Sequence, residues 1–271
     1  MKRILVTGST GFIGRHTLKI LAESGHEIST LGSVNLFDAQ GIKSLIQDIK
    51  PTHLLHLAWL TTPGVFFESP DNLKWVEATL NLVRCFSEFG GKRFVGAGTC
   101  SEILLPDSLL TFYGFCKDST RLLLEKYCKK VGVGFAWGRI YFLYGPYERP
   151  ERLVPTVIKG VLKGESVACS AGDQIRDYLY VEDCAQCFVD LVNGDKTGIF
   201  EVASGHPIQL REFILAFAQA LGRPELIKFG ARPEISGEPK VLFSKNAFMK
   251  PATSLEQGIQ KSIDYWRQEI L

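Results

Sequence analysis

The stretch MKRILVTGSTGFIGRHTLKIL (residues 1–21) decides the fold. The apolar run Ile4-Leu5-Val6 is typical of a short buried strand, and the apolar residues between Phe12 and Leu21 suit the inner face of a following helix. A sharp turn from strand to helix needs residues without a Cβ, and a helix start presents unpaired N–H groups and a positive dipole end. These properties suit a phosphate, and a pyrophosphate can approach closely where the turn carries glycines, here Gly8, Gly11 and Gly14. A glycine turn without a ligand would give the same pattern, so the choice between the two depends on the rest of the sequence.

Strand and helix patterns alternate after this turn. Helix patterns cover 38–49, where Asp38 is placed to cap the helix, then 72–90 and 113–132. This alternation predicts an α/β fold, a Rossmann-type doubly wound parallel sheet whose ligands bind at the carboxyl ends of the strands. The strand patterns lie between the helix patterns, at residues 26–32, 53–59, 93–98 and 134–145.

The regular alternation of strand and helix patterns ends near residue 150. We expect a dinucleotide-binding domain over 1–150, with segments near 177–203 returning to it, and a smaller C-terminal substrate-binding lobe over 151–271. The second part contains helix patterns at 153–164, 181–192 and 210–222, a strand pattern at 198–204, and a proline-containing tail with fewer regular segments.

Charge and composition narrow the class of protein. The formal net charge is +2 with no basic stripe, so nucleic acid is not an expected partner. No apolar run approaches the roughly 20 residues of a membrane helix, and we expect a cytoplasmic protein that binds no membrane. The seven scattered cysteines predict buried free thiols, and His53 and His56, in an apolar strand pattern, predict packed histidines, so no metal site is expected.

An acid–base pair stands out at the start of the helix pattern at 113–132. Tyr113 and Lys117 are four residues apart and share one helical face, where an ammonium lowers the pKa of a neighbouring phenol. Thr99, at the carboxyl end of a strand pattern, can donate a hydrogen bond to the same substrate oxygen. Together the three residues predict acid–base chemistry on a carbonyl/alcohol pair.

At this point the sequence resembles the extended short-chain dehydrogenases that act on nucleotide sugars. The resemblance runs nearly end to end and is carried by 7–14, 53–59, Thr99, 113–117, 138–146, 153–155, 176–183 and 201–205.

The resemblance implies a Thr99–Tyr113–Lys117 triad, in which Tyr113 exchanges a proton with a sugar hydroxyl. It also implies a nucleoside-diphosphate sugar as substrate, contacted by Thr99, Tyr113 and Arg176, and a homodimer. The alternative to substrate contact is that Arg176 forms a surface ion pair with Asp177. The residues expected to bind a nicotinamide cofactor are Gly8, Thr10, Gly11, Phe12, Ile13, Gly14, Arg15, Ser33, Asp38, Leu57, Ala58, Tyr113, Lys117 and Ile140.

The departures from the family pattern limit the reaction. Members that remove water carry Asp-Glu directly after the threonine, whereas this chain has Cys100 and Ser101, so dehydration is not expected. Glu102 would lie on the opposite face if the strand continued. Trp75 and Phe142 stand where asparagines are usual, which affects substrate contacts.

The end of the second strand pattern bears on the cofactor. Residues 29–35 contain no Asp or Glu that would bind the ribose diol and repel a 2′-phosphate, while Ser33 and Arg15 could contact that phosphate. We therefore expect NADP(H), with NAD(H) as the alternative. The resemblance implies that Asp38 bonds the adenine amino group.

Three functions fit these residues. The leading prediction is an NADPH-dependent reductase of a 4-keto-6-deoxy nucleotide sugar, because the short 33–52 segment resembles that of such reductases. The second is an NAD-dependent nucleotide-sugar 4-epimerase. The third, a catalytically silent nucleotide-binding regulator, is disfavoured by the intact Tyr113–Lys117 pair.

Overall fold

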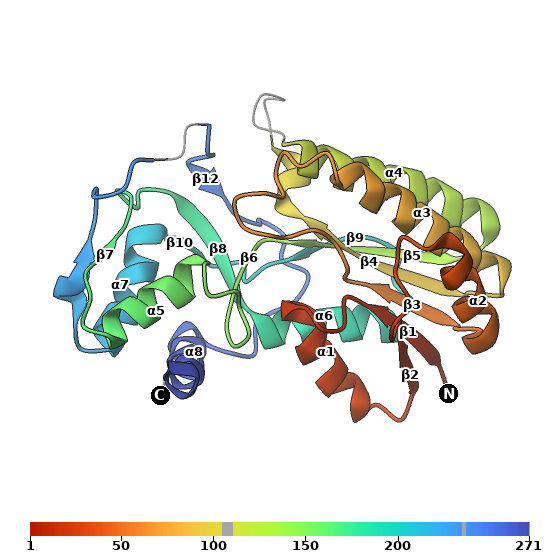
Figure 1. Cartoon of the computed structure of the whole chain (residues 1–271), viewed down its shortest axis with the longest axis horizontal. Helices are drawn as coiled ribbons and strands as arrows, with labels where there is room; N and C mark the ends of the chain where they lie inside the picture. Colours follow the sequence, from red (N-terminus) through yellow and green to blue (C-terminus); the bar gives the residue numbers. More distant parts are fainter. Residues whose placement is uncertain (105–110, 235–236, 271) are drawn as a thin grey trace. The chain divides into compact units, whose positions relative to one another are not determined.

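The computed structural model describes residues 1–104, 111–234 and 237–270 (Figure 1). The chain divides into two compact units. The first contains residues 1–140 and 185–201, and the second contains residues 141–184 and 202–271.

The first unit is built on a six-stranded sheet in the order β2-β1-β3-β4-β5-β9. The pairings from β2 to β5 are parallel, as the alternation of strands and helices predicted. The strands are β1 (Arg3–Thr7), β2 (Glu27–Thr30), β3 (His53–His56), β4 (Arg93–Thr99), β5 (Gly134–Ile140) and β9 (Gly198–Val202).

Helices cover both faces of this sheet. Helices α2, α3 and α4 lie on one face, and α1 and α6 lie on the other (Figure 1). The doubly wound architecture is confirmed. The bounds are α1 (Phe12–Ala22), α2 (Ala39–Ile49), α3 (Asn72–Glu88), α4 (Phe112–Val131) and α6 (Val181–Asn193).

The core explains why the strands form where they do. All seven residues of β4 are buried, and its apolar side chains pack with those of α3 and α4 around Phe86 and Trp137. On α2, the Asp38 carboxylate accepts hydrogen bonds from the N–H groups of Gln40 and Gly41, so the predicted cap is confirmed. All seven cysteines are buried free thiols, as predicted.

One expected strand is two. The pattern over 134–145 predicted a single strand, but β5 ends at Ile140 and β6 (Phe142–Tyr144) pairs with a strand of the second unit. The interruption is at Tyr141, whose N–H donates to the carbonyl of Val202. The apolar sequence runs on through both strands, so it carries no signal for such a change of sheet.

The second unit has a small mixed sheet around β8 (Ile175–Tyr180). Strands β10 (Pro207–Gln209) and β12 (Val241–Leu242) flank it, and β6 pairs with its second half. Its apolar core joins three helices around Phe213. The remaining elements are α5 (Leu153–Leu162), α7 (Leu210–Ala220), α8 (Leu255–Ile270), the short helices η1 (Cys100–Ile103, in the first unit) and η3 (Pro224–Leu226), and the paired strands β7 (Val167–Ala168) and β11 (Ile227–Lys228).

Helix α8 lies in the tail that the sequence predicted to be less regular. It begins with a reciprocal cap between Ser254 and Gln257, and it buries Ile259, Ile263 and Trp266 at helical spacing. Both signals were present in the sequence. Among the helices of the described ranges, none combines the length and apolar character needed to cross a bilayer.

Candidate active site

The glycine turn has the geometry of a cradle for phosphate. Gly8 has φ +71°, and a Cβ there would lie 2.7 Å from the backbone nitrogen of Ala58. A Cβ on Gly14 would overlap the carbonyl oxygen of Gly8. Gly11 is the N-cap of α1 and offers no side-chain cap, so the first N–H groups of α1 remain available to an anion. These observations fit the pyrophosphate of a dinucleotide.

The other predicted cofactor residues lie at the same carboxyl edge of the sheet. Leu57 and Ala58 follow β3 and contact the glycine turn. Thr99 ends β4 and is in register with Ile140, which ends β5. Thr10, Phe12 and Ile13 belong to the turn and to the start of α1, as the spacing of the glycines implied; they are placed by the same strand-to-helix turn.

The residues expected at the adenosine end come from three short segments. Ser33 follows β2 and is exposed, and Asp38 caps α2 with one of its carboxylate oxygens. The Nε of Arg15 donates to the carbonyl of Thr10 at 2.9 Å, which holds this side chain over the glycine turn. Within 29–35, at the end of β2, every side chain is uncharged.

Tyr113 and Lys117 face inwards from the first turns of α4. Both side chains are buried, and Trp59 contacts both of them. The Tyr113 ring meets that of Trp59 edge-on at 6.5 Å between centroids, and the Lys117 Nζ lies 4.0 Å from the Trp59 ring centroid. Phe66 packs against Tyr113 at 4.9 Å. The predicted pair therefore shares one aromatic environment.

Burial alters the acid–base properties of Lys117. Desolvation lowers the pKa of its ammonium from 10.5 to about 7, and the Glu102 carboxylate opposes that shift. The Nζ donates to the carbonyl of Ala97 at 2.5 Å. Lysines with such pKa values occur at sites where a proton is handled near neutral pH.

Thr99 is held by the short helix that follows β4. Its Oγ1 accepts from the N–H of Ser101 at 3.2 Å, and its own N–H donates to Glu102 at 2.9 Å. The strand therefore ends at Thr99, and Glu102 turns into the interior instead of lying on the opposite face of a continued strand.

Of the two histidines of β3, His56 is fully packed, as predicted, and His53 is half-buried. His56 is buried between the hydroxyls of Thr7 and Thr79, and burial lowers its pKa to about 3. It is therefore neutral at physiological pH. In the described ranges, no three His, Cys, Asp or Glu side chains are grouped so that they could hold a metal ion.

Arg176 lies in the second unit and is almost fully buried. Its guanidinium donates to Glu238 at 2.6 Å and packs over the Phe142 ring at 5.3 Å. A surface pair between Arg176 and Asp177 is wrong, because Asp177 is buried and accepts from Ser204 and Gly205. The aromatic ring at position 142 thus supports the arginine.

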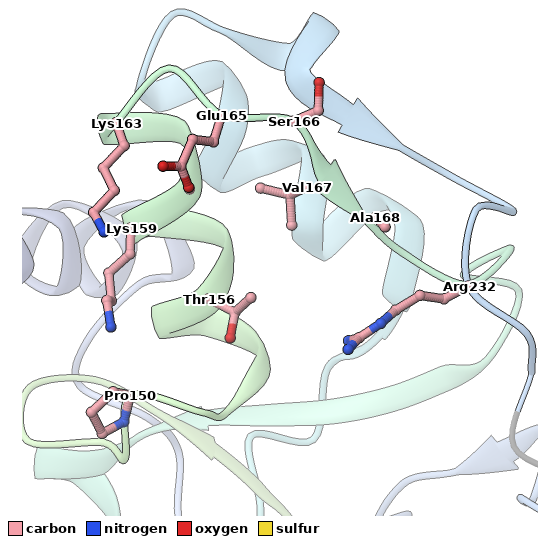
Figure 2. A pocket seen from close by; sticks show the side chains of 10 residues that line it. Pro150, Thr156, Lys159, Lys163, Glu165, Ser166, Val167, Ala168 and Arg232 are labelled. Atoms are coloured by element: carbon pink, nitrogen blue, oxygen red, sulfur yellow. The ribbon is translucent and has the colours of Figure 1, made fainter.

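The second unit also has a pocket of about 320 Å³ (Figure 2). Lys159 of α5 and Lys163, directly after that helix, lie on one side, and Arg232 points in from the other, opposite Thr156. Glu165 is the acidic side chain of the lining. The pocket is net basic, and Arg176 is not part of its lining.

The comparisons with known proteins agree with this geometry. Residues 4–203 match the sequence profile described as "NAD dependent epimerase/dehydratase family". The chain belongs to this family. Membership of this family indicates an NAD-dependent enzyme class that includes epimerases and dehydratases.

Relatives in this family include two curated enzymes. The UDP-glucuronate 4-epimerase of Thermodesulfobacterium geofontis is 24% identical, over 98% of this chain and 96% of the relative. The dTDP-6-deoxy-L-talose 4-dehydrogenase (NAD(+)) of Aggregatibacter actinomycetemcomitans is 23% identical, over 79% of this chain and 88% of the relative. Among solved structures, the Thermus thermophilus UDP-glucose 4-epimerase in complex with NAD is 25% identical, with a TM-score of 0.84 over 98% of this chain and 99% of that one.

Three residues that surround this candidate site were assigned no role from the sequence. Trp59 contacts both Tyr113 and Lys117, and Glu102 and Trp137 lie behind Thr99 and Lys117. The signal for Trp59 was available, since it directly follows the expected cofactor residues Leu57 and Ala58. Glu102 was considered only for a strand that continues past Thr99, whereas the chain turns into η1 at that point.

Proposed function

We propose that this protein is an NAD-dependent nucleotide-sugar 4-epimerase in which Thr99, Tyr113 and Lys117 act on the C4 hydroxyl. The observation that carries the proposal is the buried Tyr113–Lys117 pair on α4, next to a strand end that presents Thr99. The similar UDP-glucuronate 4-epimerase and UDP-glucose 4-epimerase support the choice of an epimerase.

Each residue has a distinct role in this proposal. Tyr113 takes the proton of the C4 hydroxyl and later returns it, and Thr99 hydrogen-bonds the same oxygen. Lys117, as an ammonium, favours the phenolate of Tyr113. The nicotinamide, when bound, supplies the hydride acceptor and donor. Trp59 and Phe66 exclude water from the pair, because they pack against Tyr113.

A second candidate is a reductase of a 4-keto-6-deoxy nucleotide sugar. The segment between β2 and β3 is short, and residues 29–35 carry no carboxylate that would repel NADP(H). The similarity to a dTDP-6-deoxy-L-talose 4-dehydrogenase also favours it. Both candidates use the same proton and hydride transfer at C4. A dehydratase is not a third candidate, because Cys100 and Ser101 cannot act as general acid and base at carbon.

An isotope experiment separates the two candidates. For the epimerase we expect UDP-glucose, UDP-glucuronate or UDP-N-acetylglucosamine, deuterated at C4, to give the C4 epimer with deuterium retained and no net NADH formed. NMR of the product measures the C4 epimer and its deuterium content, and ultraviolet absorbance measures NADH. The reductase would instead consume one NADPH per molecule of a 4-keto-6-deoxy nucleotide sugar and transfer deuterium from the cofactor to C4. That result, with no epimerisation, would reject the main proposal.

Tyr113→Phe tests the proton-transfer role. We expect kcat to fall by roughly 10² to 10⁴, the usual contribution of a general acid or base, with cofactor affinity nearly unchanged. Tyr127→Phe is the matched control, because Tyr127 lies on the same helix as Tyr113 and its hydroxyl bonds Ser87 of α3, away from the proposed chemistry. Steady-state kinetics and calorimetric titration measure the two effects. Retention of more than about a tenth of kcat would mean that Tyr113 does not transfer the proton.

The uncharged end of β2, which favours the reductase candidate, predicts the relative affinities of NADPH and NADH. We expect NADPH to bind no more weakly than NADH, since no carboxylate in residues 29–35 repels a 2′-phosphate. Arg15→Met should weaken the binding of NADPH and leave the binding of NADH unchanged. Calorimetric titration of the unmodified protein and of Arg15→Met with both cofactors gives the four affinities. Tighter binding of NADH by the unmodified protein would contradict the proposed contacts of Arg15 and Ser33.

The ion pair of Arg176 predicts a competition. A substrate phosphate that binds Arg176 has to displace Glu238, so Glu238→Gln should strengthen the binding of UDP about two- to fivefold, the equivalent of an ion pair of about 0.5–1 kcal/mol. Glu234→Gln, an exposed carboxylate in the same segment, is the control. Equal or weaker UDP binding by the Glu238 variant would show that Arg176 does not receive the phosphate.

A further inference from the structure

Glu102 is a buried carboxylate that the proposed chemistry does not use. Its side chain has no exposed surface, although a buried charge is costly unless several donors compensate it. One oxygen accepts from the N–H of Thr99 at 2.9 Å and from Trp137 Nε1 at 3.0 Å. The other accepts from Arg139 Nε at 3.2 Å.

These donors indicate the charge state of Glu102. Burial raises the pKa of the carboxyl above its ordinary value, while the bond from the Thr99 N–H, the charges of Lys117 and Arg139 and the bond from Trp137 oppose that rise. Within the described residues, the hydrogen bonds to both oxygens come from donors, Thr99 and Trp137 to one and Arg139 to the other. Because these donors stabilise the charged form, we take Glu102 as a carboxylate, and its ionisation is measured in the test below.

The backbone beside Glu102 is shaped to admit this network. A Cβ at Gly98 would overlap Trp137 Nε1 and would lie 2.7 Å from the Glu102 Oε1. Only glycine at position 98 leaves room for the indole and the carboxylate to meet. Arg139 is also bonded to Glu201 at 2.8 Å, so the guanidinium stays in place behind the carboxylate.

Glu102 and Lys117 share the indole of Trp137 as a neighbour, because its Nε1 donates to the carboxylate and its ring lies against the ammonium. The ammonium lies against the rings of Trp59 and Trp137, at 4.0 and 5.3 Å from their centroids, and bonds the Ala97 carbonyl. These neighbours carry no net charge. His56, from β3, is neutral, Arg139 from β5 is cationic, and Tyr113 lies on the helix of Lys117 itself. Glu102 is the negative group that raises the pKa of this lysine.

We propose that Glu102 is a positioning residue of the C4 redox site: it fixes the main chain of Thr99 and keeps Lys117 in the ammonium form. The inference rests on the proposed function of Thr99, Tyr113 and Lys117. Loss of the carboxylate leaves burial unopposed, so Lys117 releases its proton at lower pH and no longer assists the phenolate of Tyr113.

The direct test follows the titration of Lys117 in the cofactor-free protein. With ¹³C-labelled lysine, the Cε signal of Lys117 should change near pH 7. In Glu102→Gln the midpoint should move to lower pH, because the charge that opposes the effect of burial is removed. Glu201→Gln is the matched control, because it removes the other carboxylate partner of Arg139 and should leave the midpoint unchanged.

Two results would overturn the inference. One is an unchanged Lys117 midpoint in a folded Glu102→Gln variant. The other is a protonated Glu102 at pH 7, read from the ¹³Cδ signal of labelled glutamate in the unmodified protein, which needs no folded variant. Neither measurement uses a substrate, so failure of the proposed function is recognised separately, by the absence of turnover.

Kinetics add a second, independent readout. The high-pH limb of the kcat profile, which reports loss of the Lys117 proton, should move to lower pH in Glu102→Gln and stay in place in Glu201→Gln. Glu102→Asp keeps the charge but shortens the reach to Thr99. It should therefore lower kcat at least tenfold with its high-pH limb unmoved, and a shift equal to that of the Gln variant would reject the role of the charge.

Discussion

The indole of Trp137 lying across the glycines of β4 is the contact on which the candidate site depends. A Cβ on Gly96 would come within 2.5 Å of this ring, and one on Gly98 would overlap its nitrogen. Because β4 has glycines at these two positions, the indole nitrogen can donate to Glu102. The strand then ends in the short helix η1, which fixes Thr99. The rest of the chemistry is arranged around that strand end.

The site combines two kinds of support. Apolar packing by Trp59 and Phe66 keeps water from Tyr113 and Lys117. A balanced set of charges then offsets the cost of burial: two cations, Lys117 and Arg139, lie with two carboxylates, Glu102 and Glu201. Such networks are costly to alter singly, because removing one partner leaves another charge buried and uncompensated.

Much of the first unit could be predicted from sequence, since its signals are local. The glycine turn, the alternation of elements, the cap at Asp38 and the spacing of Tyr113 and Lys117 are each contained within a few residues. The break at Tyr141 and the inward turn of Glu102 depend on partners far along the chain, Val202 for one and Arg139 for the other. Helix α8 differs, because its cap and its apolar spacing were local and were overlooked.

The aromatic cluster around the lysine has an optical consequence. Of the four tryptophans in the chain, Trp59 and Trp137 lie within 5.3 Å of the Lys117 Nζ, and Trp75 packs on Trp59 at 6.1 Å between centroids. The tryptophan fluorescence of the first unit therefore comes from rings at or next to the Lys117 ammonium. Gain or loss of that one proton changes the electric field at these rings, so the ultraviolet fluorescence of the protein is a built-in indicator of the charge in its own candidate site.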